Sequence, residues 1–172
     1  MDQLKKHVKA FKNRNYESFD AFYHATKRRV YLTIIQIVKD EQIAEDIMQD
    51  TYMQFLKKID TIHSSQNPVA YLVKIGRNYA LNYYNKYKRE VKSDALIEAI
   101  PSQTFSDSTI DIFKLLDVLN HDEREVVVLH TINGFKFREV ASVMDKPIGT
   151  VLWLHKKAMD KLKKKLGDDD EK

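Results

Sequence analysis

The sequence predicts an all-α protein of two small helical domains joined by a linker, with a helix-turn-helix in the C-terminal domain. Its 172 residues hold only four glycines and three prolines, which favours long helices over a turn-rich β fold. Apolar residues recur at three- and four-residue steps along almost the whole chain, as they do on the buried face of a helix. A central acidic stretch contains Pro101–Ser108, whose composition is typical of a linker.

The first domain is expected to cover residues 1–92 and to contain four helices. Apolar residues at helical spacing place these helices over about 4–11, 19–38, 43–59 and 68–89. The start of the fourth helix is the clearest, because Asn67 can cap the first turn and Pro68 suits the first helical position. Residues 60–67, between the third and fourth helices, are predicted to form a loop.

The second domain is expected to follow an acidic linker at 93–108 and to cover residues 109–167. Its helices are predicted at about 109–119, 121–132, 137–144 and 148–166. Gly167 is expected to end the last helix as a C-cap residue, which leaves residues 168–172 as an acidic tail.

The segment Phe137–Leu154 fits a helix-turn-helix, in which the second helix offers its first residues to the major groove of DNA. The turn is Asp145-Lys146-Pro147, with Asp145 where a glycine is usual; aspartate tolerates the left-handed conformation better than most residues. The residues expected to face DNA are Ile148, Gly149, Thr150, Leu152, Trp153, Lys156 and Lys157. The two lysines are expected to contact phosphates. A plain helical hairpin with solvated lysines is the alternative that the pattern leaves open.

The predicted helix that begins at Pro68 is rich in tyrosine and in cations. Five of the nine tyrosines fall between residues 71 and 87. Rings that stack on unpaired bases, together with cations that follow the backbone, suit single-stranded DNA. Tyr79 and Tyr83 fit the buried face of the helix better. The candidate DNA contacts here are Lys74, Arg77, Asn78, Tyr84, Asn85, Lys86, Tyr87, Lys88 and Arg89.

An acidic group lies on one face of the third predicted helix, by the i, i+4 rule. Its members are Glu45, Asp46, Gln49 and Asp50. Paired carboxylates can act as acid–base catalysts or metal ligands, but no histidine stands at ligand spacing and no nucleophile is implied. We interpret the group either as a solvated face or as a docking surface for a basic partner.

Composition excludes several kinds of chemistry. The chain has no cysteine, so disulfides, thiol catalysis and cysteine-ligated metal centres are ruled out. Four scattered glycines cannot form a P-loop or a dinucleotide fingerprint, and the six histidines form no metal pair. No apolar run approaches the roughly 20 residues of a membrane span. We expect a cytoplasmic protein that is not an enzyme and uses no metal, cofactor or small-molecule substrate.

Both halves of the chain resemble bacterial RNA polymerase sigma factors of the small extracytoplasmic-function (ECF) group. The first half is similar to the promoter-melting domain, through Phe19–Tyr23, Ala44–Asp50 and Ala70–Asn78. The second half is similar to the domain that reads the −35 element, through Leu119–Arg124, Gly134–Ala141 and Pro147–Val151. The matching stretches follow one another in the expected order, with the expected linker between them.

The resemblance implies an alternative sigma factor, a dissociable subunit that gives RNA polymerase its promoter choice while the polymerase supplies the chemistry. The acidic face and Tyr52 would dock on core polymerase, whose β′ and β subunits are the expected partners. The loop at 60–67 would capture flipped bases of the −10 element, which adds His63, Ser64 and Asn67 to the DNA contacts. The helix-turn-helix, with Arg138 and Lys146 added, would read the −35 element of promoter DNA.

ECF sigma factors are often held by a membrane-anchored anti-sigma factor. The resemblance therefore adds an anti-sigma factor as a candidate partner, and the inner face of the membrane as the place where the chain would be sequestered.

The sequence departs from the family's pattern in two places. Leu152-Trp153-Leu154 replaces a usual polar and basic run, and Asn85 replaces a residue that is often basic. We hypothesise that Leu152 and Trp153 contact thymine methyl groups; the alternative is that they bury against a protein partner. Two other functions stay open: a stand-alone helix-turn-helix regulator, and a protein that binds polymerase or an anti-sigma factor with degenerate DNA readout.

Overall fold

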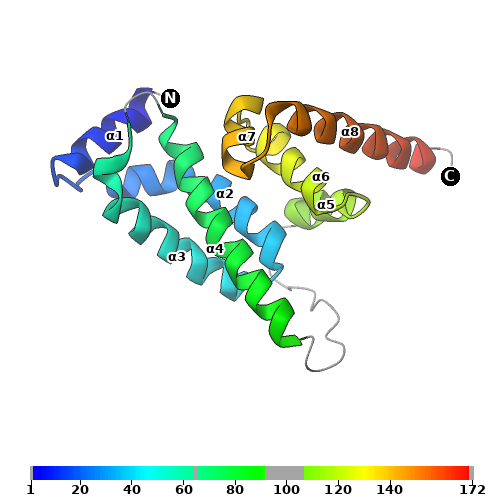
Figure 1. Cartoon of the computed structure of the whole chain (residues 1–172), viewed down its shortest axis with the longest axis horizontal. Helices are drawn as coiled ribbons and strands as arrows, with labels where there is room; N and C mark the ends of the chain where they lie inside the picture. Colours follow the sequence, from blue (N-terminus) through cyan, green and yellow to red (C-terminus); the bar gives the residue numbers. More distant parts are fainter. Residues whose placement is uncertain (1, 64–65, 92–106, 171–172) are drawn as a thin grey trace. The chain divides into compact units, whose positions relative to one another are not determined.

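The computed structural model describes residues 2–63, 66–91 and 107–170 (Figure 1). These residues form helices and short connections with no strand among them, which confirms the all-α prediction. The chain divides into two compact units, Met1–Pro101 and Ser102–Lys172. Most of the predicted linker lies outside the described residues, but its last two residues, Asp107 and Ser108, already belong to a helix.

The first unit is a bundle in which three longer helices pack on one another and a short one covers an end. The helices are α1 (Asp2–Lys12), α2 (Phe19–Val38), α3 (Glu41–Lys57) and α4 (Pro68–Val91), with a 3-10 turn at Ile59–Thr61. The cap predicted at the start of α4 is confirmed, because the Asn67 side chain accepts hydrogen bonds from the backbone N–H groups of Val69 (3.0 Å) and Ala70 (3.4 Å).

Aromatic rings fill the centre of the first unit. Phe11, Phe22 and Phe55 are fully buried, and the Phe22 ring lies 5.4 Å from each of the other two, measured between ring centroids. Tyr52 packs against the same cluster and shares a 2.7 Å hydrogen bond with the Thr26 hydroxyl. These contacts join α1, α2 and α3, so one cluster fixes the positions of three helices.

Gly76 lets α4 approach α2 and α3 closely. A Cβ atom at this position would lie 3.1 Å from the Ile34 side chain and 3.2 Å from the Thr51 hydroxyl. These separations are shorter than ordinary van der Waals contact, so the glycine sets the spacing between the three helices.

The second unit contains α5 (Asp107–Leu116), α6 (His121–Val126), a π-helical continuation (Val127–Ile132), α7 (Phe137–Met144) and α8 (Ile148–Asp170). Its helix-turn-helix has the predicted bounds, and Asp145 takes the left-handed conformation with φ of 53°. One prediction is wrong: Gly167 does not end α8, which continues to Asp170. Glycine weakens a helix by about 1 kcal/mol relative to alanine but does not by itself stop one.

A buried carboxylate ties the start of α6 to α8. Glu123 is fully buried; it closes a capping box with Asn120 and lies 2.7 Å from the Lys161 ammonium and 3.4 Å from that of Lys157. Burial raises the pKa of Glu123, but hydrogen bonds from Lys161 and from the Asn120 backbone outweigh burial, and the pKa lies below its ordinary value. The ionised form therefore helps to hold α8 in place.

Replacing Gly76 by valine tests the close approach of α4. We expect Gly76→Val to lower the free energy of unfolding by about 2 kcal/mol, because the added side chain must push α4 away from Ile34 and Thr51. Gly167→Ala is the matched control, since nothing lies within 4 Å of that position, and it should be neutral or stabilising. Chemical denaturation measures both, and an unchanged Gly76→Val protein would show that the helices have room to spare.

Replacing Glu123 by glutamine tests the buried carboxylate. Glu123→Gln keeps a cap acceptor but loses the charge, and we expect a loss of about 2 kcal/mol in unfolding free energy at pH 7. Because the folded pKa is lowered, the wild-type contribution is present above the unfolded pKa near 4.5 and is lost as the pH falls through the folded value. The difference between variant and wild type should therefore shrink below pH 4.5, whereas Asp160→Asn, an exposed change on α8, should leave stability unchanged.

Candidate nucleic-acid interface

The first turns of α8 present an exposed surface with an apolar centre. Ile148, Leu152 and Trp153 are 47%, 46% and 57% exposed. Gly149 and Thr150 are exposed beside them. Val151 and Leu154 alternate with these residues and are buried, so they attach the helix to the rest of the unit. The structure thus brings together on one surface the residues that the sequence predicted to face DNA.

Two of the predicted phosphate contacts are already engaged within the second unit. Lys157 lies over the Trp153 ring, 4.8 Å from its centroid, and also pairs with Glu123. Lys146 forms a 3.0 Å ion pair with Asp122. Lys156 and Arg138 are exposed at the edge of the same unit. Lys157 therefore holds the indole ring in addition to any role toward a phosphate.

A small ring cluster lies behind this surface. The His155 ring meets His130 at 4.9 Å and Phe137 at 5.1 Å, both measured between ring centroids, and its Nε2 lies 3.3 Å from the Thr131 hydroxyl. Burial lowers the pKa of His155, and the neighbouring His130 lowers it further. His155 is therefore neutral at pH 7 and packs as a ring rather than adding positive charge to the surface.

A second candidate DNA surface lies on the C-terminal half of α4. Tyr84 and Tyr87 are each 39% exposed, and the Tyr87 ring stacks on that of Tyr83 with 6.3 Å between centroids. The remaining members of this surface are exposed as well: Asn85, Lys86, Lys88 and Arg89. Half-exposed rings among cations supply both the stacking and the charge that unpaired bases and their backbone require.

Several other predicted contacts precede this half of α4. Asn78 and His63 are exposed, and Lys74 is half-buried. The Asn67 side chain is occupied by its helix cap. Ser64 lies outside the described residues.

Two predicted contacts are not on the surface, and those predictions need correction. Tyr52, expected on the docking face, is only 4% exposed because its ring packs in the aromatic core, and burial raises its pKa far above the ordinary value. Arg77, expected to contact DNA, is only 7% exposed. Helical spacing does not show whether a tyrosine or an arginine points into the core or toward solvent when both apolar and polar residues flank it on the helix.

The acidic residues of α3 share an exposed face. Glu45, Asp46, Gln49 and Asp50 are all exposed, as the i, i+4 spacing predicted. Burial, followed by the nearby carboxylates of Glu41 and Glu45, raises the pKa of Tyr31 on α2 to about 12. The exposed carboxylates of this face suit a cationic partner.

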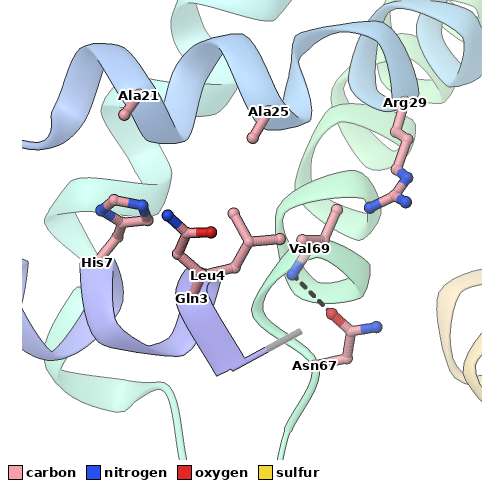
Figure 2. A pocket seen from close by; sticks show the side chains of 8 residues that line it. All are labelled: Gln3, Leu4, His7, Ala21, Ala25, Arg29, Asn67 and Val69. Carbon is pink, nitrogen blue, oxygen red and sulfur yellow. Dashed lines mark hydrogen bonds between the residues drawn. The ribbon is translucent and has the colours of Figure 1, made fainter.

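A pocket of about 410 Å³ opens between α1, α2 and the start of α4 (Figure 2). The Val69 N–H donates to the Asn67 side chain at its edge. Alkyl groups, one guanidinium, one imidazole and two carboxamides line it, from Gln3, Leu4, His7, Ala21, Ala25, Arg29, Asn67 and Val69. Sequence reasoning missed this pocket, because its walls come from three helices far apart in the chain.

Sequence reasoning also missed one group of three candidate metal ligands, at the start of α6. Ligand atoms of His121, Asp122 and Glu125 lie within 4.8 Å of one another. Asp122 is already paired with Lys146, so a cation would have to compete with that ammonium group. Within the described parts of the chain, no helix has the length and apolar content needed to span a bilayer.

Comparison with known protein families matches one family model to each of the two units. The family model for Sigma-70 region 2 matches residues 22–90, and that for Sigma-70, region 4 matches residues 115–164. The ECF RNA polymerase sigma factor EcfG of Rhodopseudomonas palustris (strain TIE-1) is 30% identical over 125 residues, which cover 69% of this chain and 68% of that protein. The ECF RNA polymerase sigma factor SigX of Bacillus subtilis (strain 168) is 23% identical over 176 residues, or 90% of each chain.

Solved structures agree with the sequence comparison. The sigma factor RpoE, in complex with the anti-sigma factor NepR from Bartonella quintana, gives a TM-score of 0.74 at 28% identity over 88% of this chain and 98% of that chain. CnrH, in complex with the cytosolic domain of CnrY, shares the fold, with a TM-score of 0.73 at 20% identity over 96% of this chain and 97% of that chain. From its two matched regions and its relatives, this chain belongs to the extracytoplasmic-function group of RNA polymerase sigma factors.

Proposed function

We propose that this chain directs promoter-specific transcription initiation by docking on core RNA polymerase through α3 and engaging promoter DNA through α4 and α8. The observation that supports the proposal is that each unit exposes a surface whose composition suits DNA. One surface has half-exposed tyrosines among cations, and the other is the start of α8, the second helix of the helix-turn-helix. The polymerase would supply the chemistry, and this chain the choice of start site.

The α4 surface is suited to the −10 element once the strands separate. Unstacking a base costs a few kcal/mol, and stacking on an aromatic ring returns about 1–3 kcal/mol per base. Tyr84 and Tyr87 offer ring faces, and Lys86, Lys88 and Arg89 offer charge to the phosphates. Capture of unpaired bases here would favour the melted promoter over the closed one.

The α8 surface is suited to the −35 element as an intact duplex. The second helix of a helix-turn-helix enters the major groove with its first residues. In this chain that helix begins at Ile148, directly after the left-handed turn at Asp145. Exposed Lys156 and Arg138 are placed to contact the phosphates that border the groove.

The acidic face of α3 is suited to a cationic surface of core polymerase. Three exposed carboxylates on one helix, those of Glu45, Asp46 and Asp50, make a compact negative patch, and such patches guide association through charge complementarity. The RpoE relative was solved with an anti-sigma factor bound, and we propose that an anti-sigma factor also regulates this chain.

Transcription in vitro tests the proposal directly. Purified chain would be mixed with bacterial core polymerase and sheared bacterial DNA, and discrete RNA starts that need the chain are the expected result. Core binding without any starts would point to a polymerase-binding protein that has lost DNA readout. Absence of both starts and core binding, with duplex binding kept, would point to a stand-alone regulator.

Charge reversal on α3 should weaken core binding. We expect Asp46→Lys combined with Asp50→Lys to raise the Kd for core polymerase at least tenfold, since two attractive contacts become repulsive. Asp20→Lys, an exposed acid on α2, is the control and should bind normally. Fluorescence anisotropy measures both, and equal affinity of the double variant and wild type would exclude this face as the docking surface.

Removing the two exposed rings of α4 should impair promoter melting. We expect Tyr84→Ala and Tyr87→Ala each to lower open-complex formation by roughly tenfold, the value of one base–ring stack. Permanganate reactivity of unpaired thymines reports the opening. Tyr84→Phe and Tyr87→Phe keep the ring face and should behave as wild type; a defect in the phenylalanine variants as large as that of alanine would contradict stacking as the cause.

A further inference from the structure

The DNA-facing part of α8 has a composition that helix-turn-helix geometry alone does not account for. Leu152 follows Ile148 by one helical turn (i, i+4), so these two side chains adjoin, and Trp153 lies beside Leu152, about 100° further around the helix. All three are about half exposed. Reading of bases usually depends on hydrogen bonds, such as those of arginine to guanine or asparagine to adenine, and Ile148 and Leu152 have no side-chain group that can form one.

We propose that this apolar face recognises the −35 element through the 5-methyl groups of thymine, so that this sigma factor prefers −35 elements with neighbouring thymines. Thymine is the base that displays a methyl group in the major groove, where an apolar side chain can pack against it. The inference rests on the proposed function of α8 and assigns the specificity within it.

Charge around the apolar face favours DNA as its occupant. From Lys146 to Met159 the sequence has no acidic residue, while lysines flank the face on both sides and Arg138 is exposed on α7. An apolar centre between cations matches a groove floor between two rows of phosphates. A stable protein–protein interface buries about 800 Å² on each partner, well above what three half-exposed side chains supply.

The contacts of Lys157 prepare Trp153 for this role. Its ammonium group lies 4.8 Å from the centroid of the indole ring and 3.4 Å from the buried carboxylate of Glu123. The ion pair with Glu123 thus fixes the Lys157 side chain, which in turn packs against one side of the Trp153 ring. A ring that is already held loses less rotational freedom on binding, so Lys157 acts as a positioning residue for the apolar face.

The experiment compares thymine with uracil, which differs from it only by the methyl group. Holoenzyme assembled from this chain and bacterial core polymerase would first select from duplexes with a randomised −35 segment. The selected duplex is then made with uracil in place of each thymine. We expect thymine at adjacent selected positions and a loss of about fourfold in affinity for each contacted methyl group removed.

Salt gives a second readout. Overall affinity must fall as salt rises, because phosphate contacts release counterions. The ratio of thymine to uracil affinity should stay the same at low and high salt, because burying a methyl group releases none. A ratio that vanished at high salt would overturn the assignment to apolar contact.

Four variants and one control locate the effect. Leu152→Ala and Trp153→Ala should bring the thymine-to-uracil ratio close to one, and Leu152→Arg should move the selected base toward guanine. Lys157→Met, which keeps the stem but not the charge, should lower the ratio without abolishing duplex binding. Leu166→Ala removes an equally exposed apolar side chain farther along α8 and should keep the wild-type ratio.

The outcomes separate this inference from the proposed function. If the holoenzyme selects a −35 sequence but binds thymine and uracil duplexes equally, the inference is overturned and the function stands. If Leu152→Ala and Trp153→Ala retain the wild-type ratio, the apolar face does not read DNA, and a protein contact is the better account. If no −35 sequence is selected and no chain-dependent start is found, the proposed function itself fails. Wild-type protein on uracil duplex needs no variant, so the test does not depend on how well Trp153→Ala folds.

Discussion

The second unit depends on the buried carboxylate of Glu123, which joins α6 to α8. It accepts hydrogen bonds at the start of α6 and pairs with two lysines one turn apart on α8. A buried charge is costly unless it is paired, so moving these lysines away from Glu123 would destabilise the second unit. Through Lys157, the same carboxylate also reaches the ring of Trp153 on the surface. The packing of α8 on α6 and the contact of Lys157 with Trp153 thus both involve this one carboxylate.

The first unit is held together by different contacts. Its centre holds stacked aromatic rings, and Gly76 allows α4 to lie close to α2 and α3. Close packing transmits position from the core to the surface. The acidic face of α3 and the exposed tyrosines of α4 belong to one packed unit, so the surfaces proposed for polymerase docking and for base capture share one core.

The division of labour between the units follows from the state of the DNA each would meet. Unpaired bases expose flat faces, and tyrosine rings match these faces at any sequence. Duplex DNA exposes only base edges, and a helix that enters the major groove can read them. Under the proposal above, Leu152 and Trp153 would contact DNA by packing rather than by hydrogen bonding, and the thymine methyl group is the feature that such packing would distinguish.

Much of this protein could be read from its sequence. Helical periodicity placed the helices of the first unit, and the cap at Asn67 and the left-handed turn at Asp145 followed from the local chemistry of single residues. The shared face of Glu45, Asp46, Gln49 and Asp50 on α3 followed from i, i+4 spacing. These features depend on residues near one another in the chain, and local sequence is sufficient for them.

Tertiary structure alone decided the rest. Burial of Tyr52 and Arg77 depends on which helices pack against them, and the pairing of Glu123 with Lys157 and Lys161 joins residues more than thirty positions apart. The pocket at Asn67 and the clearance at Gly76 likewise require three helices to meet. A helical repeat specifies which side chains share a face, but only packing determines whether that face meets solvent or another helix, because burial is a property of the neighbours and not of the repeat.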